Sequence, residues 1–82
     1  MIAMSAQLVF VSSHDCHLCD HGRDVLGSLG VAAREIAIES PEADALAAQG
    51  VPLAFLPVLW DGERVVAYGR FSEKRLRKEL GL

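Results

Sequence analysis

The feature that most constrains the fold is a short apolar run that leads directly into a helix start bearing two cysteines. Residues 8–11, Leu-Val-Phe-Val, form an unbroken apolar run, which is typical of a strand buried on both faces. Residues 12–15 are Ser-Ser-His-Asp, residue types that favour turns and helix N-caps. We therefore predict a buried strand followed at once by a helix that begins at Cys16.

The predicted first helix has an apolar face and two glycines near its end. Its interior Gly22 costs about 1 kcal/mol relative to alanine, which suggests close packing on the sheet. Gly27 and Gly30 weaken the end of the helix and stop it. The apolar residues that recur at spacings of three, four and seven are Leu18, Val25, Leu26 and Leu29.

A second strand and a second helix are expected in the middle of the chain. Residues 34–38, Arg-Glu-Ile-Ala-Ile, predict the strand. Ser40 then serves as an N-cap, Pro41 takes the first helical position, and Gly50 closes the helix. The connections between these elements are only a few residues long, as compact domains prefer.

The last third of the chain predicts a hairpin and a final helix. Residues 58–60 (Val-Leu-Trp) and 64–67 (Arg-Val-Val-Ala) are short, largely apolar stretches on either side of Asp61-Gly62, a strong hairpin signal. Ser72 is expected to begin the final helix.

These elements predict an α/β sandwich in the order β-α-β-α-β-β-α, as one domain over residues 1–82. The first β-α-β unit must be right-handed and parallel, and the hairpin extends the sheet antiparallel. The result is a four-stranded mixed sheet covered by helices. Phe10 and Tyr68 are expected in the core, and Trp60 in core or hairpin packing.

Composition and charge exclude several classes of protein. Hydrophobic residues make up 51% of the chain, but no apolar run approaches the roughly 18 residues of a membrane span. The N-terminus lacks the basic segment of a secretory leader, so we expect a cytoplasmic, monomeric protein with no membrane contact. The net charge of −3 and the lack of interleaved aromatic and basic residues argue against nucleic-acid binding.

The charge is unevenly distributed along the chain. Residues 1–63 carry nine acidic and two basic residues, whereas residues 64–82 carry six basic and two acidic ones. The basic end predicts the solvated face of a terminal helix, and it is also able to steer an acidic partner.

The Cys-x-x-C pair has the chemistry of a reactive dithiol. At a helix N-terminus the thiolate of Cys16 is favoured, which lowers its pKa from about 8.5 into the range of about 3.5–7.5. Cys19 lies one turn later, about 5–6 Å away between Cβ atoms, and its pKa should stay higher. Cys16 is therefore the attacking sulfur and Cys19 the resolving one. An imidazolium at His17 favours the Cys16 thiolate, and Asp15 opposes it.

Three alternatives compete with this interpretation. His14, Cys16, Cys19 and His21 have the residue types of a zinc site. On the predicted helix His21 lies about 200° from Cys19, so one chain offers a poor tetrahedral site and no metal is expected, although two chains could share a metal through their dithiols. A purely structural disulfide is disfavoured because the cytosol keeps thiols reduced. A non-enzymatic adaptor that uses its sheet edge or basic helix stays open, since a fold does not determine a function.

Leu56-Pro57 is a second candidate feature, directly before the predicted hairpin. If this peptide bond is cis, the backbone N–H and C=O of Leu56 face outward. They would then pair with an extended substrate beside Cys16.

The chain resembles the glutaredoxins of the thioredoxin-fold superfamily from about Leu8 to Leu80. An N-terminal strand that leads into CHLC at a helix start carries this resemblance, together with LPVLWDG before a glycine and a last helix. CHLCD with a long helix, and LPVLWDGERVVAYGRFS, are similar to a group of small glutaredoxin-like bacterial proteins.

The resemblance implies a thiol–disulfide oxidoreductase that reduces protein disulfides or glutathione mixed disulfides. Cys16 would attack, Cys19 would resolve, and a cis Pro57 would lie beside them. The implied partner is a disulfide-containing protein or a low-molecular-weight thiol, with glutathione as a candidate co-substrate. The residues expected to contact substrate are His17, Leu18, Leu56, Pro57, Gly69 and Arg70.

Overall fold

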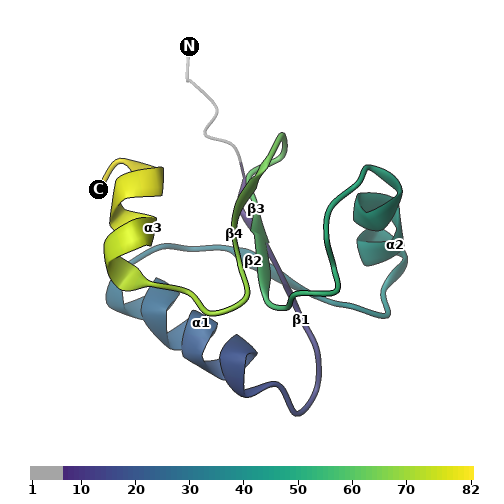
Figure 1. Ribbon diagram of the computed structural model, residues 1–82, viewed down its shortest axis with the longest axis horizontal. Helices are drawn as coiled ribbons and strands as arrows, with labels where there is room; N and C mark the ends of the chain where they lie inside the picture. The colour runs from purple at the N-terminus through teal and green to yellow at the C-terminus, as the bar shows by residue number, and fades with distance from the viewer. Residues whose placement is uncertain (1–6) are drawn as a thin grey trace.

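The structure is a computed structural model that describes residues 7–82. A four-stranded sheet stands at its centre, with helices on both faces (Figure 1). Residues 1–6, on which the expectation of no secretory leader partly rests, lie outside the described residues. The elements are β1 (Val9–Ser12), α1 (His17–Ser28), β2 (Arg34–Ala37), α2 (Pro41–Ala48), β3 (Val58–Trp60), β4 (Val65–Tyr68) and α3 (Glu73–Leu80).

The predicted order and strand directions are confirmed. The strands lie in the order β2-β1-β3-β4, with β1 parallel to β2 and the hairpin strands antiparallel. β1 is therefore a central strand, and all four of its residues are buried, including the polar Ser12. The burial of Val9, Phe10 and Val11 is what the unbroken apolar run predicts. The sheet is mixed because the first connection is a helical crossover and the later one is a hairpin.

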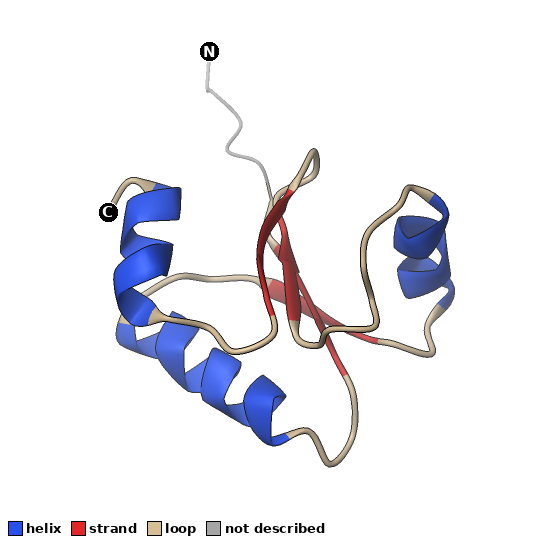
Figure 2. Cartoon of the chain, in the orientation of Figure 1, coloured by secondary structure: helices blue, strands red, loops and turns tan. Residues whose placement is uncertain are grey.

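The helices divide between the two faces of the sheet. Figure 2 shows α1 and α3 on one side of the strands and α2 on the other. One core cluster, around Phe10, Leu59 and Leu76, packs beneath α1 and α3. The other, around Val11 and Val58, packs beneath α2. Within the described residues, no helix is long and apolar enough to cross a membrane.

Serine caps begin two of the helices as predicted. The Ser40 hydroxyl accepts a hydrogen bond from the N–H of Ala43 (3.2 Å), with Pro41 in the first turn of α2. The Ser72 hydroxyl accepts from the N–H of Arg75 (3.3 Å) at the start of α3. These bonds satisfy donors that a helix start leaves without intrahelical partners.

One core prediction is confirmed and another is wrong. Phe10 is almost fully buried, but 56% of Tyr68 is exposed. Tyr68 ends β4, the strand at the opposite edge of the sheet from β2, against which α2 packs. Helix α2 therefore does not reach it, and the Tyr68 ring lies beside that of Phe55, with 5.8 Å between the ring centroids.

Candidate active site

The sulfur of Cys16 caps the first helix. Cys16 has extended backbone angles (φ −114°, ψ 102°), and its Sγ accepts a hydrogen bond from the N–H of Cys19 at 3.0 Å. Asp15, in the left-handed region at φ 52°, turns the chain just before it. The helix thus starts one residue later than predicted, and Cys16 itself is its N-cap. A sulfur in this position receives the N–H dipole that stabilises a negative charge.

The two cysteines are joined by a disulfide and differ in exposure. Their Cα atoms lie 5.1 Å apart, within the usual range of about 4.4–6.8 Å. Cys19 is fully buried in the core cluster beneath α1, whereas Cys16 is partly exposed at its rim. Only Cys16 is therefore open to a molecule approaching from solvent.

The Leu56-Pro57 peptide bond is cis, as hypothesised from the sequence. Pro57 is buried, and Leu56 packs against both core clusters. The N–H of Gly69 lies 2.9 Å from the carbonyl oxygen of Pro57 and 3.0 Å from that of Phe55. These bonds join the end of β4 to the segment of residues 55–57, which we call the proline loop. They bring Leu56, Pro57 and Gly69 together.

Gly22 shows how closely the proline loop approaches the dithiol helix. A Cβ atom at Gly22 would lie 3.1 Å from both Phe10 and Pro57, and 3.2 Å from Phe71. Gly22 lies one turn after Cys19 in α1, so Pro57 packs against the same helix that carries the cysteines. The close packing that this glycine suggested in the sequence is confirmed.

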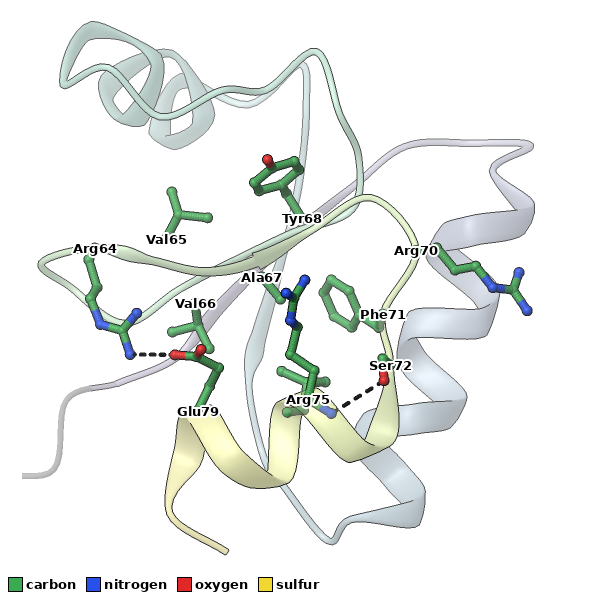
Figure 3. A pocket seen from close by; sticks show the side chains of 11 residues that line it. Arg64, Val65, Val66, Ala67, Tyr68, Arg70, Phe71, Ser72, Arg75 and Glu79 are labelled. Atoms are coloured by element: carbon green, nitrogen blue, oxygen red, sulfur yellow. Dashed lines mark hydrogen bonds and ion pairs between the residues drawn. The ribbon is translucent and has the colours of Figure 1, made fainter.

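Three residues expected to contact substrate lie at the surface. His17 and Arg70 are exposed, and 37% of Leu18 is exposed, so Leu18 does not belong to the buried face of α1 as its spacing predicted. It lies in the first turn of α1, in which Cys19 is the residue buried in the core. In Figure 3 the side chain of Arg70 points away from the neighbouring side chains of β4 and α3.

His21 makes a contact that its sequence position did not reveal. Its Nε2–H donates to the carbonyl oxygen of Phe71 at 3.0 Å, joining α1 to the loop before α3. No local pattern predicts a bond between residues 50 positions apart. Within residues 7–82, no three or more His, Cys, Asp or Glu side chains are grouped to hold a metal ion.

A charged network fixes α1 to the sheet. Arg23 donates to both carboxylate oxygens of Glu35 on β2, at 2.7 and 2.9 Å, and its guanidinium lies 5.9 Å from the centroid of the Phe10 ring. The Ser12 hydroxyl donates to the same carboxylate at 2.6 Å. Hydrogen bonding from Arg23 lowers the pKa of Glu35, and the bond from Ser12 lowers it further.

Glu35→Gln is expected to lower the urea midpoint of unfolding at neutral pH. The pKa of Glu35 is lower in the folded chain than in the unfolded one. Its contribution is therefore present above the unfolded value of about 4.3 and is lost as pH falls through the folded value. The midpoints of the two proteins should therefore converge as the solution is acidified below that unfolded value.

Glu42→Gln is the matched control for this measurement. Glu42 forms an ion pair with Arg34 that is about as exposed as the Arg23–Glu35 pair, but among the described residues it lacks the added bond that the buried Ser12 hydroxyl donates to Glu35. A Glu35 variant with the same midpoint as the Glu42 variant at neutral pH would contradict the anchoring role of the network.

Comparisons with known proteins identify the fold. No protein-family model and no curated protein sequence matches the chain. Among solved structures it is similar to the glutaredoxin-like protein NrdH-redoxin from Escherichia coli, a protein described as having a thioredoxin-like activity profile. The TM-score is 0.66 and the identity 24%, over 88% of this chain and 92% of that chain. The predicted thioredoxin-like fold of the glutaredoxin type is confirmed.

Proposed function

We propose that this protein is a cytoplasmic thiol–disulfide oxidoreductase that acts through the Cys16–Cys19 pair. The observation that carries the proposal is the position of Cys16, whose Sγ accepts an N–H at the start of α1 while Cys19 is buried behind it. A helix N-terminus stabilises thiolate, and thiolate is the species that attacks disulfides. The burial of Cys19 then leaves Cys16 as the one sulfur that an incoming disulfide can meet.

The reaction proceeds in two exchanges from the reduced protein. The Cys16 thiolate attacks one sulfur of the substrate disulfide, a new S–S bond forms, and the other substrate sulfur leaves as a thiolate that takes a proton. Cys19, once deprotonated, attacks Cys16 Sγ, forms the intramolecular disulfide and releases the second substrate thiol. Two electrons pass from the protein to the substrate, and an external thiol must return them.

The substrate is held by the surface around the two cysteines. The backbone of Leu56, beside Pro57, pairs with an extended segment on either side of the substrate disulfide. His17 and Leu18 in the first turn of α1, and Gly69 and Arg70 after β4, complete the contact surface. The exposure of His17, Leu18 and Arg70 supports this assignment.

The preferred substrate is a protein disulfide, with glutathione as a candidate reductant for the oxidised pair. The thioredoxin-like activity profile described for NrdH-redoxin supports this order of preference. The protein acts as a monomer without a metal, and the cytoplasm supplies the reducing conditions that return Cys16 and Cys19 to thiols.

Redox titration followed by intact and native mass spectrometry tests the proposal. Across a series of glutathione buffers, the protein should gain and lose two hydrogens reversibly. It should also form a transient glutathione adduct that Cys16→Ser abolishes. In the reduced protein, thiolate absorbance should give a Cys16 pKa below the value of about 8.5 for free cysteine. A zinc adduct that survives reduction, with no reversible disulfide, would refute the proposed oxidoreductase activity.

A further inference from the structure

β4 is an edge strand with backbone groups open to a partner. It pairs only with β3, so one side of its backbone has no neighbouring strand in the described chain. The N–H of Gly69 bonds to Pro57, and alternation in an antiparallel pair then directs the backbone groups of Tyr68 away from β3. Such an edge is a template on which another strand can pair.

A groove of about 360 Å³ runs between this edge and α3 (Figure 3). We call it the β4–α3 groove. An ion pair between Arg64 and Glu79, 3.1 Å long, lies at one end of it. Ser72 lies at the other end, and apolar side chains lie between them. The residues that define it here are Arg64, Val66, Ala67, Ser72, Arg75 and Glu79.

The charge of the β4–α3 groove is positive. Arg64 and Arg75 line it, and Glu79 is the one acidic residue among the described lining residues, while the side chain of Arg70 points away from it. Glu79 is paired with Arg64, whereas Arg75 forms no ion pair with any of residues 7–82. Figure 3 shows the Arg75 side chain extending from α3 toward β4, beside Ala67. A guanidinium in this position favours a carboxylate as its partner.

We propose that the β4–α3 groove binds an extended acidic segment of a partner protein, which adds to β4 as a further strand. Successive side chains of a strand point to opposite faces. One set of the partner's side chains then lies over α3, where carboxylates meet Arg75. The other set lies on the α2 side, beside the exposed rings of Phe55 and Tyr68. The recognised segment alternates acidic and apolar residues.

The groove adjoins the candidate active site. Tyr68 ends β4, and the next residue, Gly69, is bonded to the carbonyl oxygen of Pro57 at 2.9 Å. A partner strand over the four residues of β4 would extend about 13 Å from that point. This inference rests on the proposed function in one respect: it makes the groove a surface that selects among protein disulfides.

Peptide binding to a redox-inactive protein tests the proposal. The probe is a fluorescently labelled, end-capped octapeptide of alternating glutamate and valine, and the protein carries Cys16→Ser and Cys19→Ala. Fluorescence anisotropy should show binding that weakens as salt is raised. A peptide of the same composition, with its glutamates and valines in two blocks, should bind about tenfold more weakly. Equal binding of the two peptides would overturn strand addition.

Arg75→Glu and Lys74→Glu form a matched pair of variants. Both reverse a charge on an exposed residue in the first turn of α3, where glutamate is well tolerated, but only Arg75 lines the groove. Arg75→Glu should weaken binding of the alternating peptide by about tenfold or more, and Lys74→Glu by less than about twofold. Equal losses would overturn the proposal in favour of unspecific charge attraction.

Two further outcomes separate the alternatives. If sedimentation shows a dimer that Arg75→Glu dissociates, the occupant of the groove is a second copy of this chain and the proposal is wrong. If the redox-active protein exchanges no disulfides while the alternating peptide still binds as expected, the proposed function fails and the groove assignment is supported.

Discussion

Cys16→Ser is expected to reduce disulfide exchange to the uncatalysed background, whereas a Cys19 variant is expected to stop after the first exchange. Serine at position 16 removes the nucleophile but still provides an N-cap oxygen for the N–H of Cys19. The fold should therefore persist, and the lost activity will report on chemistry rather than on unfolding. A fluorescent peptide disulfide, followed by rate and by mass spectrometry, measures both effects.

The Cys19 variant needs a replacement that suits a buried position. Cys19 is fully buried, and an unpartnered serine hydroxyl there would cost roughly 1–3 kcal/mol. Cys19→Ala keeps the site apolar and is the better choice. It should accumulate a mixed disulfide at Cys16 because no second thiol is present to release the substrate. Normal turnover of protein disulfides by this variant would show that the two-cysteine mechanism is wrong.

Gly22→Val is expected to lower the free energy of unfolding by roughly 1–3 kcal/mol. The Cβ atom alone would lie 3.1 Å from Phe10 and Pro57, and the valine methyl groups would extend further into the same buried contacts. To relieve these close contacts, α1 would have to move away from the proline loop. This movement should also slow disulfide exchange. Urea unfolding and the exchange rate together measure the effect.

Gly27 is the matched control for Gly22. It lies in the same helix, but a Cβ atom there would meet no atom within 4 Å. Gly27→Ala should therefore raise the free energy of unfolding by about 1 kcal/mol through helix propensity alone. Gly22→Ala should gain less than this, because tight contacts offset the propensity. If Gly22→Val is as stable as Gly27→Ala, the packing of Pro57 against α1 is not as described.

Much of the fold was predictable because local signals and the global topology agree. The apolar run of β1, the serine that caps α2 and the Asp61-Gly62 turn each occur where the structure places a strand, a helix start and a hairpin. The Asp61 carboxylate even accepts bonds from the N–H groups of Glu63 and Arg64, both at 2.8 Å, which lower its pKa. Such signals act over a few residues and need no tertiary information.

The errors concern side chains whose surroundings depend on distant elements. Tyr68 is a large aromatic residue of the kind expected in a core, but it ends an edge strand that α2 does not cover. Leu18 matches the helical spacing, yet in the first turn of α1 the core buries Cys19 and leaves Leu18 exposed. His21 bonds to a carbonyl 50 residues away. In each case the tertiary arrangement overrides the local pattern.

The candidate site was predictable only where its residues are close in sequence. Cys16 and Cys19 are close in sequence, so helix geometry alone brings them together. The approach of Pro57 to α1 depends instead on Gly22, Phe10 and Phe71, which come from three parts of the chain. The groove that Arg75 lines depends likewise on the position of β4 at an edge of the sheet beside α3, which no local pattern indicates.

The unequal exposure of the two sulfurs should also allow Cys16 to be labelled selectively. In the reduced form a bulky maleimide should couple to Cys16 and leave Cys19, which is sealed in the core, unmodified. The natural sequence therefore offers a single attachment point for a fluorophore or a spin label, with no cysteine to remove. A label there would lie at the start of α1, at the rim of the core cluster, and would report on a molecule that approaches the candidate site.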